Sequence, residues 1–348
     1  MRAARLHRYD PDLAGPEFLQ FDEVDEPAIT EPDDVIVRVG GSGVCRTDLH
    51  IIQGVWDDGL QTDLPYTLGH ENAGWVEEAG AAARSVAPGD AVVVLPGLAD
   101  GTCDVCRRGL DNRCPALVWQ GIQVDGGFTG FLRTKSRNLV PIPEELSPAE
   151  AAPYADAGIT AYHAAKIAVR DVVPGETVAV IGIGGLGHVA IQVLKALTPA
   201  RIVAIDRSKE ALALAGRFGA DHAVLAETDS VAEVLDLTGG AGCAAVIDFV
   251  GEGEVPAQAF SMAGAGGRYV VVGYGGTLEI PALDIMGTER QIVGAIGGTY
   301  SDLRELLALA ADGRVELLTV EYPFEEVNRA LGDLAAGRLR GRGVLVHT

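Results

Sequence analysis

The first 155 or so residues contain short apolar or alternating runs that are separated by Gly, Pro and Asp. Three of these runs are typical of β-strands: "DDVIVRVGGSGVC" at 33–45, "NAGWVEEAG" at 72–80 and "GDAVVVLPG" at 89–97. The stretch "LPYTLGHENAG" and the cysteine-rich segment 100–115 have the composition of loops. Strands joined by such turns predict a small barrel or sandwich.

From residue 177 the pattern changes to strands that alternate with helices. "TVAVIGIGGLGHVAIQVLKAL" predicts a strand, a glycine turn and a helix, and two more helices are expected at 208–220 and 230–240. Further strands are expected at 201–206, 221–225, 244–251, 267–273 and 290–297. This alternation predicts a parallel sheet covered on both faces, so the fold class is α/β. Six strands in this region match a complete doubly wound nucleotide-binding domain.

The tail predicts two helices, in "YSDLRELLALAADGRV" and "PFEEVNRALGDLAAGRLRGRGVLVHT", and a final strand that could return to the first domain. We therefore expect a β-rich domain at 1–156, a nucleotide-binding domain at 157–296 and a returning C-terminal segment at 297–348.

The glycine turn "GIGGLG" has the G-x-G-x-x-G pattern of a dinucleotide-binding loop. Gly182 permits the tight turn, Gly184 allows the backbone to approach a pyrophosphate, and Gly187 lets the helix pack on the strand. Together with Gly185 and Leu186, the loop opens a helix whose first N–H groups are free to bind phosphates. The alternative is a plain turn between a strand and a helix.

Asp206 ends the next predicted strand, about 20 residues after the loop, where a carboxylate can accept hydrogen bonds from the adenosine ribose. A carboxylate there repels a 2′-phosphate, so NAD is favoured over NADP. Arg207 weakens this preference, because an adjacent arginine can accommodate that phosphate.

Composition and charge narrow the choice of partners. The 348 residues are 48% hydrophobic and 22% charged, with a formal net charge of −22, which argues against nucleic acid or an anionic membrane surface as a partner. No run of about 18 apolar residues predicts a membrane span. The N-terminal sequence "MRAARLHRYDPD" has no apolar signal segment, so we expect a cytoplasmic protein.

Three of the five cysteines are clustered in "DGTCDVCRRGLDNRC". In a chain without an export signal, this clustering indicates metal binding rather than disulfides. Cys103, Cys106 and Cys114 supply three zinc ligands, and a structural site needs a fourth. Asp100 continues the two-residue spacing and is the expected fourth ligand, with Asp104 and Asp111 as local competitors; the alternative is a metal-free loop with three thiols.

Cys45, His70 and Asp156 together offer the sulfur, nitrogen and oxygen ligands of a catalytic zinc site, which keeps a fourth position open. Each has a simpler interpretation on its own. Cys45 suits a core position, His70 a hydrogen-bonded turn, and Asp156 the N-cap of the helix that follows it.

Taken together, the motifs resemble the zinc-dependent medium-chain alcohol dehydrogenases over nearly the whole chain. The resemblance depends on "GVCRTDLH", "LGHENAGWVEEAG", "VAPGD", the cysteine cluster, "DAGITAYHA", "GIGGLGHVAIQ" followed by Asp206, and "RGRGV", in the order and spacing of the family. It implies a GroES-like catalytic domain, split in sequence around a Rossmann domain, with a catalytic zinc on Cys45, His70 and Asp156. The aspartate at position 156 resembles the bacterial secondary-alcohol branch. The family usually has four cysteines in the structural zinc lobe, and Asp100 departs from that pattern.

The resemblance also implies roles for neighbouring residues. Thr47 takes the alcohol proton and passes it along the nicotinamide ribose to His50 and so to solvent. Asp48 orients His70, and Glu71 lies beside the metal. Arg340 or Arg342 reaches a cofactor phosphate, and Arg46 is either a phosphate contact or a solvent-facing charge.

The expected function is hydride transfer between NAD(H) and a small secondary, or primary, alcohol or ketone, in a homo-oligomer that is a tetramer or a dimer. Trp56, Trp119 and Tyr154 are candidates for an apolar pocket wall, or for core packing. The alternatives are a polyol or sugar dehydrogenase, a zinc-free quinone-reductase-like enzyme, which would have no use for the metal ligands, and a non-catalytic nucleotide-binding module.

Overall fold

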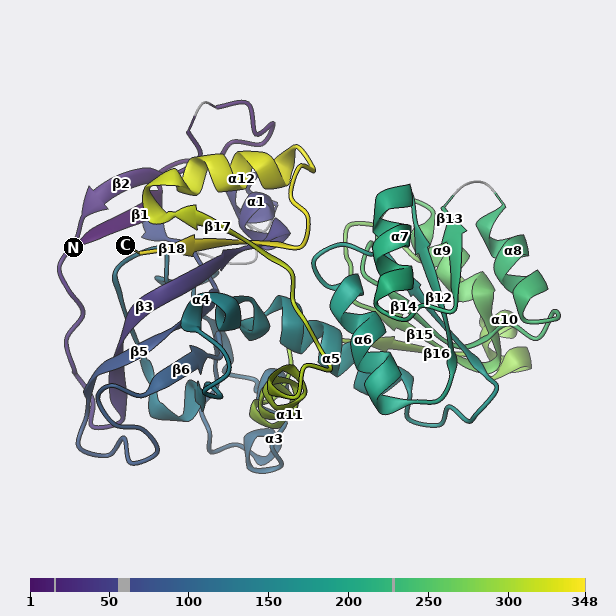
Figure 1. Cartoon of the computed structure of the whole chain (residues 1–348), viewed down its shortest axis with the longest axis horizontal. Helices are drawn as coiled ribbons and strands as arrows, with labels where there is room; N and C mark the ends of the chain where they lie inside the picture. Colours follow the sequence, from purple (N-terminus) through teal and green to yellow (C-terminus); the bar gives the residue numbers. More distant parts are fainter. Residues whose placement is uncertain (16, 56–62, 227–228, 348) are drawn as a thin grey trace. The chain divides into compact units, whose positions relative to one another are not determined.

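A computed structural model describes residues 1–15, 17–55, 63–226 and 229–347. The chain divides into two compact units (Figure 1). The first consists of Met1–Ala157, Thr299–Ala311 and Leu317–Thr348, and the second of Gly158–Gly298 and Asp312–Glu316. Each unit has its own sheets and its own apolar core.

The first unit is built on a seven-stranded sheet with the order β10-β6-β5-β3-β18-β17, in which β9 also pairs with β3. These strands are β3 (Asp34–Val44), β5 (Glu71–Ala79), β6 (Ala91–Val94), β9 (Phe131–Lys135), β10 (Leu139–Pro141), β17 (Thr319–Pro323) and β18 (Arg342–Val346). Two smaller sheets contain β1 (Arg2–Leu6), β2 (Gln20–Glu23) and β4 (Tyr66–Thr67), and β7 (Gly97–Leu98) with β8 (Val118–Trp119). The strands expected at 33–45, 72–80 and 89–97 are therefore present as β3, β5 and β6, and β17 is a strand that the sequence reading missed.

Strand β3 shows why this sheet forms. Val35, Val37 and Val39 alternate along the strand into an apolar core, while Arg38 between them is exposed. The pairing of β3 with β5 is interrupted by two shifts of register, between Ile36 and Val37 and between Val39 and Gly41. Such irregularities bend a strand and redirect its side chains. The C-terminal end of β3 leads directly into Cys45.

The tail of the chain packs on this sheet. Strand β18 pairs antiparallel with β3, so that Val344 lies opposite Gly43. Helix α12 (Val327–Ala335) covers β17 and β18 (Figure 1) and contributes Val327 and Leu331 to the core. The other helices in the described part of this unit are α1 (Arg46–Ile52), α3 (Asp104–Arg107), α4 (Pro148–Ala151), α11 (Tyr300–Ala311) and the short 3-10 helices η1 (Asp111–Arg113), η2 (Ser136–Asn138), η3 (Ala152–Ala155) and η4 (Phe324–Glu326).

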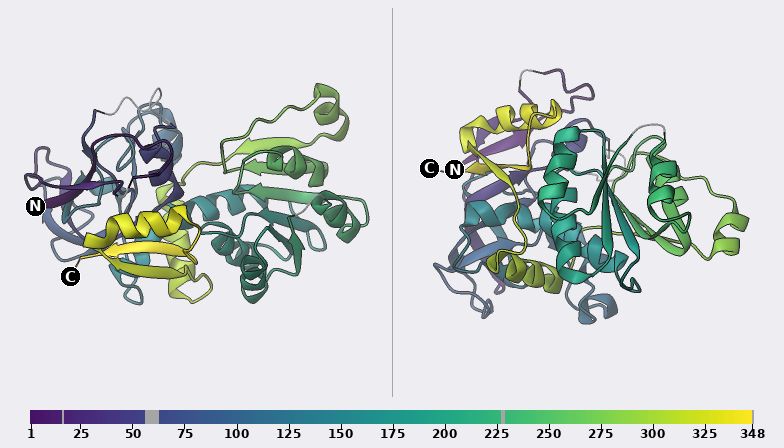
Figure 2. Two further views of the ribbon diagram at one scale, coloured as in Figure 1. Left: turned by 90° about the horizontal axis from the view of Figure 1, so that it is seen from above. Right: turned by 45° about the vertical axis from the view of Figure 1, so that its right-hand side comes forward.

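The second unit is a six-stranded parallel sheet with the order β13-β12-β11-β14-β15-β16. The strands are β11 (Thr177–Ile181), β12 (Arg201–Asp206), β13 (His222–Leu225), β14 (Cys243–Asp248), β15 (Ala263–Val271) and β16 (Gln291–Gly294). The helices are α5 (Ala157–Ala168), α6 (Gly187–Leu197), α7 (Lys209–Arg217), α8 (Ser230–Leu237), α9 (Val255–Met262) and α10 (Ala282–Thr288). Figure 2 shows helices on both faces of this sheet. The predicted α/β fold class with a doubly wound sheet is confirmed.

The middle residues of the central strands are apolar, since both faces of the sheet are covered. All five residues of β11, "TVAVI", are buried. The short segment Asp312–Glu316 belongs to the same unit, and the Gln192 side chain of α6 bonds both backbone groups of Glu316, at 2.8 Å each. Within the described residues, no helix is both long and apolar enough to cross a membrane.

Candidate metal and cofactor sites

Cys45, His70 and Asp156 come together in the first unit, although 111 residues separate the first from the last. Their ligand atoms all lie within 4.8 Å of one another. The Asp156 Oδ2 atom is 3.5 Å from Cys45 Sγ and 3.5 Å from His70 Nε2. Cys45 immediately follows β3 and is the N-cap of α1, His70 immediately precedes β5, and Asp156 immediately follows η3.

This donor set fits a zinc ion. The Nδ1 and Nε2 atoms of His70 are both buried, and neither makes a hydrogen bond of good geometry: Nδ1 lies 3.3 Å from Asp48 Oδ1, and Nε2 lies 3.5 Å from Asp156 Oδ2. A buried nitrogen without a partner is costly, and a metal ion bound at Nε2 removes that cost. Burial raises the pKa of Asp156, but His70 and then Arg342 outweigh it and lower the pKa to about 2, so the carboxylate is ionised. One thiol, one imidazole and one carboxylate leave the fourth zinc position open.

Asp48 fixes the ring of His70 from behind. Its Oδ2 atom accepts a hydrogen bond from the Cys45 backbone N–H at 2.7 Å, and its Oδ1 atom lies 3.3 Å from His70 Nδ1. Asp48 is fully buried. A carboxylate on the far nitrogen of a ligating histidine sets the tautomer and the orientation of the ring.

Thr47 and His50 lie on α1, whose first turn starts at Cys45. The Thr47 backbone N–H donates to Cys45 Sγ at 3.4 Å, which ties this turn to the metal ligand. Both side chains are half-buried, whereas Arg46 is exposed. The helix therefore presents a hydroxyl and an imidazole three residues apart, next to Cys45.

Glu71 and Arg342 form a buried ion pair beside the metal ligands. Arg342 Nε donates to Glu71 Oε2 at 2.8 Å and to Oε1 at 3.1 Å, and Nη2 also donates to Oε1. The Ala157 backbone N–H donates to Glu71 Oε1 at 3.0 Å. Arg342 Nη2 also lies 3.5 Å from Asp156 Oδ2, so one guanidinium joins Glu71 to a predicted ligand.

The sequence reading did not find this pair. It offered Arg342, with Arg340, for a cofactor phosphate, but in the structure Arg342 is buried and bonded to Glu71. Arg340 lies exposed in the turn before β18. The signal "RGRGV" was visible, but nothing local in it distinguishes the two arginines. The Ala157 N–H contact had no sequence signal at all.

The cysteine lobe gathers Asp100, Cys103, Cys106 and Cys114, again with ligand atoms within 4.8 Å of one another. Asp100 Oδ2 is 3.2 Å from Cys114 Sγ, while its Oδ1 atom accepts from the Cys103 backbone N–H at 2.8 Å. One carboxylate oxygen thus holds the loop and the other faces the thiols. The backbone N–H groups of Thr102 and Cys103 keep the pKa of Asp100 well below its usual range.

Neither competitor for the fourth position belongs to this group of ligand atoms. Asp111 is bonded to Arg137 Nη2 at 2.9 Å, and Asp104 is an exposed residue in the first turn of α3. Burial, and then the neighbouring Cys103, raise the pKa of the Cys106 thiol to about 12. Thiols packed this closely resist joint ionisation unless a cation compensates the charge, which is the chemistry of a zinc site.

The glycine loop of the second unit connects β11 to α6. Gly182 has a left-handed backbone, with φ of +86°, next to Val250. A Cβ atom on Gly187 would lie 2.0 Å from the Gly182 carbonyl oxygen, so a larger residue does not fit there. A Cβ atom on Gly184 would have no neighbour within 4 Å, so the backbone is open to a ligand there. Gly185 and Leu186, the N-cap residue of α6, follow it in the loop. The loop therefore combines a tight turn with backbone that a phosphate can approach.

Asp206 is bonded to this loop. Its Oδ2 atom accepts from the Ile183 N–H at 2.6 Å, and its Oδ1 atom accepts from the Ser208 N–H at 2.8 Å. These bonds place a carboxylate at the C-terminal end of β12, beside the loop, with Arg207 exposed next to it. The remaining lone pairs suit the two hydroxyls of a ribose.

Of the candidates for a pocket wall, Tyr154 is buried in η3, two residues before Asp156, and Trp119 is half-buried at the end of β8. Trp56 lies outside the described residues.

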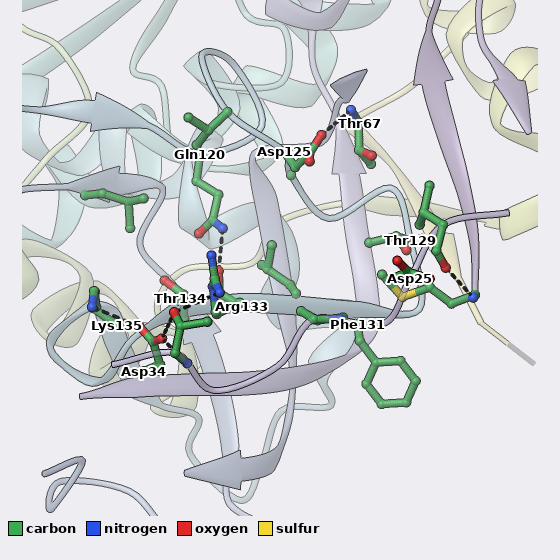
Figure 3. A pocket seen from close by; sticks show the side chains of 18 of the residues that line it. Asp25, Asp34, Thr67, Gln120, Asp125, Thr129, Phe131, Arg133, Thr134 and Lys135 are labelled. Atoms are coloured by element: carbon green, nitrogen blue, oxygen red, sulfur yellow. Dashed lines mark hydrogen bonds and ion pairs between the residues drawn. The ribbon is translucent and has the colours of Figure 1, made fainter. Parts of the chain in front are cut away.

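A cavity of about 550 Å³ lies elsewhere in the first unit (Figure 3). Gln120, Asp125 and Lys135 are among its lining residues, and each is engaged within the protein: Gln120 Nε2 bonds the Arg133 carbonyl, Asp125 accepts from the Thr67 N–H, and Lys135 pairs with Asp34. None of the predicted metal or cofactor residues lines it.

A cluster of zinc-type ligands in a β-rich unit, and a dinucleotide-type loop in a doubly wound sheet, define a metal-dependent dehydrogenase. The family model described as the alcohol dehydrogenase GroES-like domain matches residues 31–144, and that of the zinc-binding dehydrogenases matches 185–312. The chain belongs to the zinc-dependent medium-chain alcohol dehydrogenase family, and it is an oxidoreductase. The resemblance inferred from the motifs is confirmed.

Three similar proteins illustrate the relationship. An alcohol dehydrogenase of Geobacillus stearothermophilus is 38% identical over 94% of this chain and 96% of its own length. A D-arabinose 1-dehydrogenase (NADP(+)) of Saccharolobus solfataricus is 36% identical over 99% of this chain and 97% of its own. The crystal structure of the alcohol dehydrogenase from Aeropyrum pernix has a TM-score of 0.93 and 44% identity, covering 99% of this chain and 100% of that one.

Proposed function

We propose that this enzyme transfers hydride between NAD(H) and a small alcohol or its carbonyl counterpart, with a secondary alcohol and ketone as the preferred pair. The observation that carries the proposal is the convergence of Cys45, His70 and Asp156, in which the buried Nε2 atom of His70 makes no hydrogen bond and faces the other two ligands. A non-catalytic nucleotide-binding module has no need of this cluster.

Cys45, His70 and Asp156 would hold the catalytic zinc, and the carboxylate at 156 would be one of its two anionic ligands. A zinc ion bound there supplies Lewis acidity, which lowers the pKa of an alcohol hydroxyl toward neutrality. Asp48 holds the His70 ring so that Nε2 faces the other ligands, and it does so at 3.3 Å from Nδ1. The protein thus contributes the geometry of the ligands and the tautomer of the histidine.

Thr47 and His50 would handle the proton. The Thr47 Oγ1 atom can accept the alcohol proton and donate its own, because a hydroxyl is both donor and acceptor. His50, half-buried on the same helix, would exchange that proton with solvent, because an imidazole ring can both accept and donate a proton.

Glu71 and Arg342 would keep the charge around the ligands balanced. The guanidinium neutralises the Glu71 carboxylate and approaches Asp156 within 3.5 Å. Burial raises the pKa of Glu71, and Arg342 opposes that rise. Removing either residue would leave the other as a buried charge without its partner.

The loop of Gly182, Gly184, Gly185, Leu186 and Gly187 would bind the cofactor pyrophosphate, and Asp206 the adenosine ribose. Arg207 and Arg340 are the proposed phosphate contacts. NAD supplies the hydride acceptor, and the protein sets its position. Because the D-arabinose 1-dehydrogenase relative is named for NADP(+), the cofactor preference of this chain should be measured by comparing kcat/KM with NAD and with NADP.

The proposal is tested by replacing Cys45 with Ala. We expect kcat/KM to fall by about a thousandfold, since the metal contributes several kcal/mol and each 1.4 kcal/mol is tenfold. NAD binding should be largely unchanged, because the glycine loop does not depend on Cys45. Cys243→Ala, which removes a buried thiol at the other end of β14 from the cofactor edge, is the matched control. Undiminished turnover in Cys45→Ala would contradict the assignment.

A second candidate is a polyol or sugar dehydrogenase with the same metal site. The similarity to a D-arabinose 1-dehydrogenase supports this alternative. A panel of secondary alcohols, polyols and sugars, each assayed with NAD and with NADP, separates the two. Higher kcat/KM for polyols or sugars than for apolar alcohols would replace the first candidate with the second.

We also propose that the cysteine lobe binds a zinc ion. We further propose that residues 1–156 form the catalytic domain, residues 157–296 form the NAD-binding domain, and residues 297–348 return to the catalytic domain. Two compact units with a composite first unit support this division. The cytoplasmic location stays a prediction.

We propose a homo-oligomer, either a tetramer or a dimer. The support is the family resemblance and the exposed apolar residues at one edge of the parallel sheet. Among the described residues, β16 pairs with β15 alone. Leu283, Met286, Ile292 and Ile296 are exposed on and around it, and α10 lies at this edge (Figure 2). An open edge strand with exposed apolar side chains is a common pairing surface. Light scattering coupled to size-exclusion chromatography tests it, and a monomer at assay concentration would contradict it.

A further inference from the structure

Asp248 and Tyr269 are buried, ionisable residues in the parallel sheet, and the proposed chemistry uses neither. Asp248 is the last residue of β14, and both side chains are fully inaccessible to solvent. The Tyr269 hydroxyl, from the neighbouring strand β15, donates to Asp248 Oδ2 at 2.9 Å. Burying a carboxylate is costly unless its oxygens are bonded, so a residue of this kind needs a reason to be there.

Asp248 bonds two backbone loops at the C-terminal edge of the sheet. Its Oδ1 atom accepts from the N–H groups of Val250 and Gly251, at 2.8 and 2.9 Å. Its own carbonyl accepts from the N–H groups of Val272 and Gly273, at 3.0 and 2.9 Å. One residue thus receives five hydrogen bonds and connects the loop 249–251 after β14 to the loop 272–276 after β15.

The two loops are packed against each other without room for adjustment. A Cβ atom on Gly251 would lie 2.1 Å from the carbonyl carbon of Gly273, and Gly276 donates to the Gly251 carbonyl at 2.7 Å. Gly251 itself has a left-handed backbone, with φ of +62°. The Asp248 side chain therefore holds the loop 249–251, and the close packing of Gly251 on Gly273 couples that arrangement to the loop 272–276.

The position of these loops suggests what they serve. The strand order runs from β11 outward to β12 and β13, and the chain then returns to β14, so the order reverses between β11 and β14. Dinucleotides bind across the C-terminal edge at such a reversal, with one mononucleotide on each half of the sheet. The glycine loop and Asp206 belong to the first half, which assigns the adenosine end to it. The loops bonded by Asp248 occupy the edge of the second half.

We propose that Asp248, with Tyr269, is a positioning residue for the nicotinamide half of the cofactor: it fixes the loops 249–251 and 272–276 against which that half binds. This rests on the proposed NAD-dependent function. Asp248 does not touch the reacting atoms in this proposal, and it acts through the backbone of the two loops.

The test compares the binding of NAD and of AMP to the full chain by isothermal titration calorimetry, for wild type and Asp248→Ala. AMP contains only the adenosine half. We expect the NAD dissociation constant to rise about tenfold or more, since the Val250 and Gly251 N–H groups lose their carboxyl acceptor and the loops loosen. The AMP constant should change by less than about twofold, because the variant leaves the glycine loop and Asp206 intact. A structural defect of the whole unit would weaken both ligands equally.

Two further variants sharpen the result. Asp248→Asn should recover most of the NAD affinity, because its amide oxygen can accept from Val250 and Gly251 while its NH₂ group donates to the Tyr269 oxygen. Tyr269→Phe removes one donor and should weaken NAD binding in the same direction by a smaller factor, and it serves if Asp248→Ala does not fold. Cys243→Ala, at the opposite end of β14, controls for general loss of stability.

Unchanged NAD binding in Asp248→Ala, or in Tyr269→Phe if the former does not fold, would overturn the inference. Equal losses for NAD and AMP would also overturn it. If the wild-type chain bound neither ligand, the proposed function itself would fail, and this inference with it.

Discussion

Gly43 illustrates how one backbone position admits a buried charge. A Cβ atom there would lie 1.9 Å from Glu71 Oε2, which no real side chain tolerates. Because Gly43 and Glu71 are paired residues of β3 and β5, the missing side chain leaves room for the carboxylate directly above the sheet. That carboxylate then meets Arg342, which β18 brings in from the far end of the chain.

The Glu71–Arg342 pair gives a prediction at the scale of single residues. Arg342→Met should lower the free energy of unfolding by about 3–5 kcal/mol, because it leaves the Glu71 carboxylate buried without its partner. Urea denaturation of the variant measures this loss.

The chain provides a matched control two residues away. Arg340 is exposed, so Arg340→Met should change stability by no more than about 0.5 kcal/mol. The double variant Glu71→Gln/Arg342→Met should recover part of the loss, since no unpaired charge stays buried. Equal effects of Met at 340 and at 342 would show that the ion pair contributes nothing specific.

At the scale of elements, the end of β18 carries a pH-sensitive contact. His347 follows β18 and stacks on Phe324 of η4, with ring centroids 4.3 Å apart. Burial lowers the pKa of His347 below its ordinary value of 6.5, although Thr129 and Glu325 partly oppose this. The folded state therefore binds fewer protons than the unfolded state in the window between the folded pKa and 6.5.

We expect stability from this residue to be complete above pH 6.5 and to be lost as the pH falls below that value. His347→Phe keeps an aromatic ring against Phe324 and cannot be protonated, so the stability of wild type relative to the variant should decline as the pH falls from about 7.5, one unit above the ordinary histidine pKa, to about 5. Denaturation of both proteins at several pH values measures the difference in their unfolding free energies. Groups other than His347 titrate in both proteins, so their contributions cancel in this difference. A difference that stays constant with pH would contradict the prediction.

At the scale of the whole molecule, metal content distinguishes the two clusters. We expect about two zinc ions per chain, one at Cys45, His70 and Asp156 and one in the cysteine lobe. Asp100→Ala removes the fourth lobe ligand and the acceptor of the Cys103 backbone N–H. The variant should therefore lose one zinc ion and unfold at a lower temperature, while its turnover largely persists. Metal analysis by mass spectrometry and thermal unfolding measure these effects.

Asp104→Ala is the control for the lobe, because Asp104 is acidic, local and outside the ligand group. Its metal content and unfolding temperature should match those of wild type. A wild-type chain with one zinc would contradict the lobe assignment and leave the catalytic one intact.

Local pattern was enough to predict most of the parallel sheet. The runs that form β11 and β12 each contain four consecutive apolar residues, and each is followed by a glycine or an N-cap serine that marks the next helix. Strand β17 was missed because "TVEYP" is short, only partly buried and ends in proline. Strand β15 begins earlier than expected, at Ala263, because its first residues are small and glycine-rich and carry no strand signal.

The sequence by itself determined the ligand types, the glycine loop with its acidic residue, and the alternation of strands and helices, because these depend on side-chain chemistry and on spacing along the backbone. Tertiary structure decided between partners that the sequence left open. It grouped Asp100, the expected ligand, with the thiols rather than Asp104 or Asp111, gave Arg342 rather than Arg340 to Glu71, and bonded Tyr269 to Asp248. The physical reason is that burial, side-chain direction and hydrogen-bond partners are set by packing between segments far apart in the sequence, up to 271 residues for Glu71 and Arg342.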